Sequence, residues 1–235
     1  MNDVISGVLC GADQLRHSIH LPNHLKPKIR VAVFGSFYGG FHVLSELLEP
    51  PLAELVTVTG VATDDPSQSF THADVRLWKY PHTQAEEQLV GVLARANDLP
   101  VHTGRVKTPD FERIFVEDWK PDLCLMATFG QKIPRSIFEV PRLGFYNFHH
   151  SDDTWPSYPG PDPIAGMVRD GKTHVVITMH EVTEVLDGGA AIARSHRVPL
   201  PRDANAVKVH RLTWPQMGEF IRREIRRAIF NGVVH

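Results

Sequence analysis

Apolar and polar positions along the chain predict strands and helices in alternation. Four apolar runs have the composition of buried strands: 29–35, 55–62, 121–128 and 144–149. Helical spacing of apolar residues predicts helices between them: 41–48, about 84–97, and a further helix from 109. Strands that alternate with helices form mostly parallel sheets with right-handed crossovers. The predicted fold class is therefore α/β, a Rossmann-like twisted sheet with flanking helices.

The starts of two of these helices are marked by capping residues. Thr83 and Glu86 have the spacing of a capping box, in which each side chain accepts from a backbone N–H of the other residue. Thr108 stands before Pro109, which is an N-cap residue followed by proline at the first helical position. These signals place the helix starts at residues 84 and 109.

The pattern changes after residue 149. Four prolines stiffen the stretch 151–163, and a short helix is expected near 164–169. The runs 174–182 and 190–198 predict an antiparallel strand pair, and the tail from 205 to 230 is helical with a break at Pro215. The chain is thus divided into three parts: an N-terminal extension (1–28), a main domain (29–200) and a C-terminal helical segment (201–235).

Composition narrows the class of protein. With 235 residues and 42% hydrophobic content, the chain can bury a core without disulfides, and its two cysteines are too few for a disulfide framework. A net charge of −2 predicts no nucleic-acid or membrane partner. The N-terminus lacks the pattern of a signal peptide, and no apolar run approaches the roughly 18 residues of a membrane span. We therefore expect a cytoplasmic protein.

Metal and dinucleotide sites are both disfavoured. The chain has 14 histidines but no His-Glu-x-x-His pattern, and the neighbours His149 and His150 would point to opposite faces of a strand. The segment from Gly35 to Gly40 departs from the Gly-x-Gly-x-x-Gly fingerprint, and its Phe37 and Tyr38 would hinder a pyrophosphate. We expect no metal site.

Three polar residues have separable chemical roles. Asn147 and His149 are two positions apart on a predicted strand, so their side chains share one face. Asp187 lies about forty residues later in the turn Leu186-Asp187-Gly188-Gly189. An amide can donate to a developing oxyanion, an imidazole can move a proton, and a carboxylate can orient that imidazole.

Three segments in this order resemble the catalytic domain of the folate-dependent formyltransferases. They are residues 121–134, residues 143–149 with Asn147-Phe148-His149, and residues 186–189. That family includes enzymes acting on glycinamide ribonucleotide, methionyl-tRNA, sugar nucleotides and N-hydroxyornithine. The resemblance covers about residues 29–200, so we predict that this range is a formyltransferase catalytic domain.

The resemblance implies a donor, an activity and a set of site residues. It implies 10-formyltetrahydrofolate as formyl donor and an amine of a small metabolite as acceptor, with Asn147, His149 and Asp187 as catalytic residues. Asn147 would donate to the oxyanion, and either His149 or Asp187 would accept the proton. Folate would be bound largely through backbone groups of two segments: Phe129, Gly130, Gln131, Lys132 and Ile133, and Val182, Thr183, Val185 and Leu186.

The sequence departs from the family around the predicted acceptor pocket. A more acidic loop replaces the usual Ser-Leu-Leu-Pro-like stretch, and it carries the candidate acceptor-binding residues Ser151, Asp152, Asp153, Trp155 and Tyr158. Asp187-Gly188-Gly189-Ala190 also replaces the usual Asp-Thr-Gly-Asp. Two carboxylates near an arriving amine would favour a cationic acceptor. They slightly favour an N-hydroxyornithine-type siderophore precursor over an amino-sugar nucleotide, with glycinamide ribonucleotide as a further candidate.

Three rival functions are less consistent with the sequence. Methionyl-tRNA is disfavoured as acceptor because only some 35 residues follow the matched region, too few for a basic RNA-binding domain. A Rossmann-like oxidoreductase would need a glycine fingerprint, which is absent, and an acidic ribose-binding residue, for which Asp64 or Asp65 is available. A non-catalytic folate-binding protein is disfavoured by the intact catalytic residues. A homodimer is left open.

Overall fold

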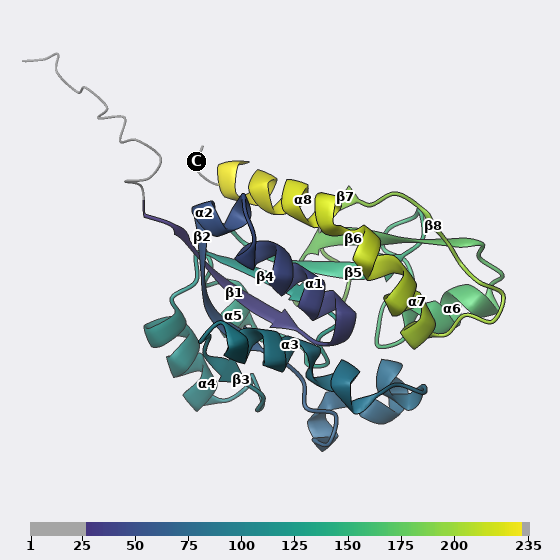
Figure 1. Cartoon of the computed structure of the whole chain (residues 1–235), viewed down its shortest axis with the longest axis horizontal. Helices are drawn as coiled ribbons and strands as arrows, with labels where there is room; N and C mark the ends of the chain where they lie inside the picture. Colours follow the sequence, from purple (N-terminus) through teal and green to yellow (C-terminus); the bar gives the residue numbers. More distant parts are fainter. Residues whose placement is uncertain (1–26, 232–235) are drawn as a thin grey trace, which may run out of the picture.

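The computed structural model describes residues 27–231, and within this range eight strands form one mixed sheet (Figure 1). The strands are β1 (Ile29–Gly35), β2 (Val56–Ala62), β3 (Val101–His102), β4 (Leu123–Ala127), β5 (Phe145–Ser151), β6 (His174–Glu181), β7 (Ala191–Arg194) and β8 (Val198–Pro199). Their order is β3-β2-β1-β4-β5-β6-β7, with β8 paired to β6. The predicted N-terminal extension, residues 1–28, lies outside the described residues except for its last two.

Parallel pairing extends from β3 to β5, and antiparallel pairing then adds β6, β7 and β8. This confirms the predicted α/β fold with a mostly parallel sheet and an antiparallel pair near its C-terminal part. The capping box at Thr83 is also present, since its hydroxyl accepts from the backbone N–H of Glu86.

The helices and helical turns connect these strands. The α-helices are α1 (Phe37–Leu48), α2 (Leu52–Leu55), α3 (Gln84–Ala96), α4 (Pro109–Arg113), α5 (Arg135–Phe138), α6 (Pro163–Arg169), α7 (Ala206–Thr213) and α8 (Gly218–Asn231). A π-helical turn, η5 (Ile114–Trp119), extends α4. Short 3₁₀ turns are η2 (Ser69–Thr71), η3 (Ala73–Val75), η4 (Leu77–Lys79) and η6 (Trp214–Gln216).

Two cores lie on opposite faces of the sheet. Along β1, Val31 and Val33 belong to one core, whereas Ala32 and Phe34 belong to the other, because successive side chains of a strand point to opposite faces. The larger core packs α1, α3, α6, α7 and α8 on the sheet, and the smaller, aromatic core packs α4, η5 and α5. The result is a three-layer α/β arrangement.

Helix α1 begins four residues earlier than the sequence pattern predicted. The pair Gly39-Gly40 favours a loop, but both glycines are inside the helix. A Cβ atom on Gly40 would lie 2.4 Å from the backbone carbon of Gly35, so glycine is required where α1 turns tightly away from β1. Phe37, at the first helical position, is wholly buried and packs against Trp78. The prediction was wrong because tertiary contact overrides the local preference of the glycines.

The C-terminal helices pack on the main core and are not a separate layer. Phe220 and Ile221 of α8 belong to the same cluster as α1 (Figure 1). Arg211 of α7 donates from Nε and Nη2 to both carboxylate oxygens of Glu86 on α3, at 2.6 and 2.8 Å. This pairing, with the N-cap contacts, lowers the pKa of Glu86 to about 2. It fixes α7 at the edge of the cavity described below. None of the helices between residues 27 and 231 has the length and apolar character needed to cross a membrane.

Candidate active site

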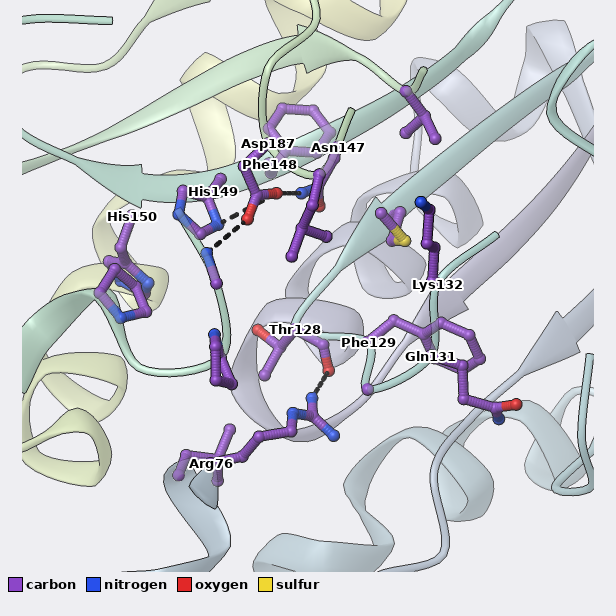
Figure 2. Close-up of a pocket in the computed structure, with 18 of the residues that line it drawn as sticks. Arg76, Thr128, Phe129, Gln131, Lys132, Asn147, Phe148, His149, His150 and Asp187 are labelled. Carbon is purple, nitrogen blue, oxygen red and sulfur yellow. Dashed lines mark hydrogen bonds and ion pairs between the residues drawn. The ribbon is translucent and has the colours of Figure 1, made fainter. Parts of the chain in front are cut away.

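A cavity of about 320 Å³ opens at the carboxyl ends of β4 and β5 (Figure 2). Ligands of open α/β sheets bind at this edge, where the loops that follow the strands diverge. Asn147, His149 and Asp187 lie at its centre. Phe129 and Lys132 lie on one side of these three residues and His150 on the other (Figure 2).

Asp187 is the residue on which the three predicted catalytic side chains converge. Its Oδ1 accepts from Nδ2 of Asn147 at 3.3 Å and lies 3.8 Å from Nδ1 of His149. Its Oδ2 accepts from the backbone N–H of Gly160 at 2.9 Å. The side chains of His149 and Asp187 are only 11% and 8% exposed, so these contacts are little screened by water. The structure thus brings together the three residues predicted from the motifs.

The turn after β6 requires its glycine at position 189 and has a conformation that suits its aspartate at position 187. Asp187 has φ of 48°, a left-handed conformation that aspartate tolerates better than most residues. A Cβ atom on Gly189 would lie 2.0 Å from the carbonyl oxygen of Glu181, so this position must be glycine. The turn can therefore fold back onto β6 and direct the Asp187 carboxylate toward β5.

His180 belongs to this cluster, although the sequence patterns did not point to it. It is the register partner of Asn147 across β5 and β6. Its Nε2 accepts from Nδ2 of Asn147 at 3.1 Å, while its Nδ1–H donates to the carbonyl of Glu181 at 2.8 Å. Burial lowers the pKa of His180 to about 4, so the ring is neutral near pH 7. Pairing between β5 and β6 places it there, and no local motif encodes that pairing.

The hydrogen bonds of His149 define which of its nitrogens is free. A backbone carbonyl can only accept, so Nε2–H donates to the carbonyl of Tyr158 at 3.2 Å. In the neutral ring, Nδ1 then carries the lone pair, and this is the nitrogen that faces Asp187.

All nine residues predicted to bind folate line the cavity. They form what we call the loop side, consisting of residues 129–133 after β4 and 182–186 after β6. The side chain of Gln131 is occupied elsewhere, since it accepts from Val106 N–H and donates to the carbonyl of Gly104 at 3.0 and 3.1 Å. Gln131 therefore fixes the loop's shape and leaves apolar surface and backbone to face the cavity.

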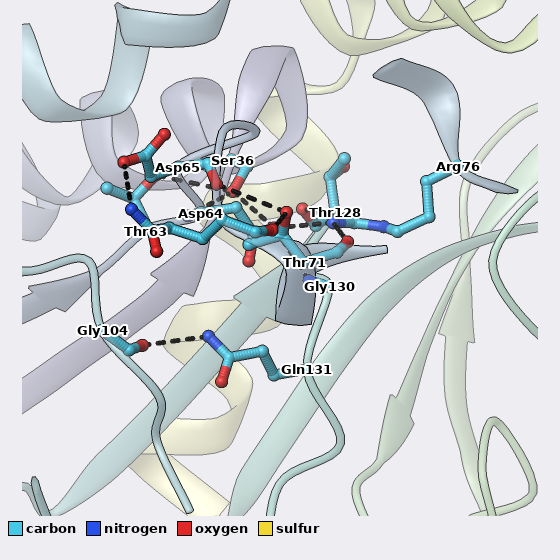
Figure 3. Close-up of polar contacts among 11 residues, drawn as sticks. Ser36, Thr63, Asp64, Asp65, Thr71, Arg76, Gly104, Thr128, Gly130 and Gln131 are labelled. Carbon is cyan, nitrogen blue, oxygen red and sulfur yellow. Dashed lines mark hydrogen bonds and ion pairs between the residues drawn. The ribbon is translucent and has the colours of Figure 1, made fainter. Parts of the chain in front are cut away.

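Asp64 also holds this loop in place (Figure 3). Its Oδ2 accepts from the Gly130 N–H, from Arg76 Nη1 and from the Ser36 hydroxyl at 2.8, 2.8 and 3.0 Å. The Asp64 carboxylate is fully buried in these contacts, and Asp65 accepts from Ser67. An acid that binds a nucleotide ribose must be free to accept from its hydroxyl groups, so this arrangement weighs against an oxidoreductase.

The predicted acceptor-binding residues do not line the cavity. Asp152 pairs with Lys172 at 2.7 Å, and Asp153 pairs with Arg197 and His174, each at 2.8 Å. The remaining three make internal contacts: Ser151 with Thr178, Trp155 with Gly189, and Tyr158 with Asp170. Only the end of this loop reaches the cavity, through Gly160, Pro161 and Pro163. The loop therefore lies beside the site as predicted, but its acidic half folds away from it.

The rest of the lining, which we call the helix side, was not predicted. It consists of side chains from distant elements: His72, Val75, Arg76, Leu77, His150, Ile164, Ala206 and His210, with Pro161 and Pro163. These residues come from the η2–η4 region, β5, α6 and α7. The η2–η4 region, β5, α6 and α7 are far apart in the sequence, so the sequence alone could not show that they meet.

The fold and this site define an α/β protein with an amide, an imidazole and a carboxylate converging in a cavity at the strand ends. A family model described as Formyl transferase matches residues 61–212, which is more than half of the chain. The chain belongs to this family.

Curated relatives include methionyl-tRNA formyltransferases from several bacteria. That of Chloroflexus aggregans is 30% identical over 177 residues, covering 75% of this chain and 52% of the relative. That of Roseiflexus castenholzii is 34% identical over 87 residues, covering 37% of this chain and 27% of the relative. The chain thus spans about half or less of the length of these relatives.

Solved structures share the fold. Glycinamide ribonucleotide transformylase 1 from Geobacillus kaustophilus superposes with a TM-score of 0.62 at 19% identity, covering 85% of this chain and 99% of that one. WlaRD, a sugar 3N-formyl transferase solved in the presence of dTDP and 5-N-formyl-THF, gives a TM-score of 0.61 at 17% identity. That match covers 88% of this chain and 65% of WlaRD.

Proposed function

We propose that this chain transfers a formyl group from 10-formyltetrahydrofolate to an amine of a small metabolite. The observation that carries the proposal is the convergence of Asn147, His149 and Asp187 in a cavity between the loop side and the helix side. Membership of the formyl transferase family supports the class of reaction. Formyl transfer to an amine needs an oxyanion donor and a proton acceptor close together, and this cluster contains both.

The loop side has the properties expected of a folate pocket. Phe129, Ile133 and Val182 supply apolar surface for a flat ring system, and the cavity volume lies in the range of small-molecule sites. Val185 and Leu186 are apolar yet 67% and 54% exposed at the rim, as expected for residues that a bound ligand covers. When bound, 10-formyltetrahydrofolate supplies the activated formyl group.

Asn147 is proposed as the oxyanion donor. In the structure its two Nδ2 protons are directed at Asp187 and at His180, so both are occupied. Negative charge developing on the formyl oxygen would compete with these acceptors for one proton. The neutral His180 is the weaker competitor, because donation to an ionised acceptor is roughly twice as strong. Such a donor contributes about 3–4 kcal/mol to transition-state stability.

His149 is proposed as the proton acceptor. Its Nδ1 carries the free lone pair, whereas each Asp187 oxygen already accepts a hydrogen bond. Protonation of Nδ1 would create an imidazolium 3.8 Å from the Asp187 carboxylate, close enough for direct stabilisation. Asp187 then acts by orienting Asn147 and by stabilising the charged His149.

The proposal leaves several chemical classes of acceptor amine to be compared. The preference for an N-hydroxyornithine-type amine rested on the charges of Asp152 and Asp153, and both carboxylates are paired with cations of the chain. These charges therefore give no reason to prefer a siderophore precursor over an amino-sugar nucleotide, and both are candidate acceptors. Relatives named for methionyl-tRNA, glycinamide ribonucleotide and sugar acceptors define the range to be tested.

Two measurements on the purified protein test this function. Calorimetry is expected to show binding of 5-formyltetrahydrofolate and no specific binding of NAD(H) or NADP(H). Incubation with 10-formyltetrahydrofolate and a panel of amines should release tetrahydrofolate and yield a formylated amine identified by mass. Tight nicotinamide binding without folate binding would favour an oxidoreductase. Folate binding without formylation of any amine would favour a non-catalytic folate-binding protein.

A further inference from the structure

Two buried histidines, His150 of β5 and His210 of α7, form a contact pair on the helix side of the cavity. Their ring centroids are 4.5 Å apart, the residues are 4% and 6% exposed, and both line the cavity. His150 lies across the catalytic residues from Phe129 and Lys132 (Figure 2). The proposed mechanism uses neither ring.

Thr213 defines the tautomer of His150. The Thr213 hydroxyl has one proton, which it donates to the carbonyl of Val209 at 2.8 Å. It must therefore accept in its 2.9 Å contact with His150, whose Nε2 is the donor. In the neutral ring of His150, Nδ1 is then a hydrogen-bond acceptor.

Trp214 defines the tautomer of His210 in the opposite sense. The indole N–H can only donate, and it donates to Nδ1 of His210 at 3.1 Å. Nδ1 therefore carries a lone pair, and the proton of the neutral ring is on Nε2. One ring thus retains a free acceptor and the other a free donor.

These two nitrogens are not used in hydrogen bonds within the described part of the chain, residues 27–231. Between residues 27 and 231, the fully enclosed side-chain polar atoms without a partner are Asp64 Oδ1 and Trp78 Nε1. Within the same range, Nδ1 of His150 and Nε2 of His210 make no hydrogen bond to the protein, whereas the other nitrogen of each ring is bonded to Thr213 or Trp214. Both residues line the cavity, so their rings are next to a ligand bound there.

The helix side has no side chain, among residues 27–231, whose charge is free for a ligand. Burial lowers the pKa of His150 well below its usual range and that of His210 to about 3, and the charge of Arg76 adds to the lowering at His210. Arg76 is held by Asp64 and by the carbonyls of Thr71 and Thr128. Much of the remaining wall is apolar, including Leu77, Pro161 and Ile164. A carboxylate or phosphate would lose its hydration here without gaining a free cation.

We propose that His150 and His210 determine acceptor specificity by binding one uncharged hydroxyl group next to the reacting amine. The hydroxyl would donate to Nδ1 of His150 and accept from Nε2–H of His210. This inference rests on the proposed formyl transfer, because it identifies the helix side as the acceptor side. It excludes an acceptor that places a carboxylate or a phosphate at this position.

Three probe amines that differ at one position test the proposal. They are trans-2-aminocyclohexanol, cyclohexylamine and 2-aminocyclohexanecarboxylate, used with the wild-type protein saturated with 5-formyltetrahydrofolate. The aminoalcohol is expected to bind about tenfold more tightly than the other two, since it satisfies two buried polar groups that they leave unpaired. In ¹⁵N spectra of histidine-labelled protein, it should shift one nitrogen in each of two histidine rings.

Substitutions of His210 test whether the two histidines cause the preference for the aminoalcohol. His210→Phe keeps a ring but removes the donor, and it should reduce the tenfold preference to within about threefold. His210→Gln can accept from Trp214 and donate to the ligand, so it should restore the preference. His102→Phe is the matched control, because His102 packs its ring on Phe111 outside the cavity, and it should leave the preference unchanged.

The readouts separate failure of this inference from failure of the proposed function. If the aminoalcohol is preferred and shifts both rings but no amine is ever formylated, the pair binds hydroxyls and formyl transfer is wrong. If amines are formylated but wild type binds the three probes equally, or His210→Phe keeps the preference, the pair does not select the acceptor. If wild type shows neither formylation nor a preference, both proposals are wrong. The comparison in wild type does not depend on the folding of any variant.

Discussion

The two sides of the cavity are built in different ways. The loop side consists of two continuous segments, 129–133 and 182–186, which follow β4 and β6 and present apolar surface and backbone. The helix side consists of side chains from stretches far apart in the sequence, and it includes two buried histidines, His150 and His210, whose pKa values burial lowers. A continuous segment can be recognised from its own residues. A wall assembled from distant residues exists only after the helices have packed.

The largest expected effect is at Asn147, which lies between the two sides. Asn147→Ala should lower turnover at least 100-fold, because a buried oxyanion donor contributes about 3–4 kcal/mol. The affinity for 5-formyltetrahydrofolate should change less than threefold, since the loop side remains intact. Steady-state kinetics and calorimetry on the same preparation measure both. A variant that keeps more than half of wild-type turnover would remove Asn147 from the mechanism.

The next expected effect is a pH dependence of folding stability that comes from the helix side and not from the loop side. Burial lowers the pKa of His210 to about 3 in the folded protein, with the charge of Arg76 contributing, against about 6.5 in the unfolded chain. Between these values the unfolded chain binds the additional proton. The contribution of His210 to the free energy of unfolding is therefore complete above about pH 6.5, and it decreases below that pH by about 1.4 kcal/mol per pH unit.

Urea unfolding at pH 7, 6 and 5 measures this slope. His210→Phe should have a slope smaller by about 1.4 kcal/mol per pH unit, whereas Leu186→Asp on the loop side should retain the wild-type slope over pH 5 to 7. Equal slopes for wild type and His210→Phe would show that His210 is not buried as a neutral ring.

A tenfold effect is expected on the loop side. Leu186→Asp should weaken folate binding about tenfold, because it removes the apolar contact at the rim and adds a charge. Stability should be nearly unchanged, since Leu186 is 54% exposed. Ile192→Asp is the matched control, because Ile192 is 45% exposed on β7 and does not line the cavity. Equal folate affinities for the two variants would place the folate elsewhere.

The smallest effect is expected in the acidic loop. Asp153→Asn should leave the acceptor KM within twofold of wild type, because Asp153 is paired with His174 and Arg197 outside the cavity. A several-fold rise in the acceptor KM, with unchanged folate affinity, would restore the sequence-based hypothesis that this loop attracts a cationic amine. The measurement thus tests whether the helix side alone contacts the acceptor.

Short stretches of the sequence were enough to predict most of the elements and the centre of the site. The β1 strand, the capping box at Thr83 and the pairing of Asn147 with His149 follow from periods of two and 3.6 residues and from caps, which act within a few residues. The turn at Asp187 was recognisable because it, too, is a continuous motif.

The early start of α1, the position of His180 and the helix side depend on contacts between distant parts of the chain. The helix start depends on the approach of Gly40 to Gly35, and His180 is positioned by the β5–β6 register. His150 and His210 are 60 positions apart in the sequence and meet only because α7 packs beside β5. Packing over long sequence separations depends on the sum of many weak contacts, which no local pattern contains. The same packing buries both rings and lowers their pKa values, so their neutral state near pH 7 is a consequence of the fold.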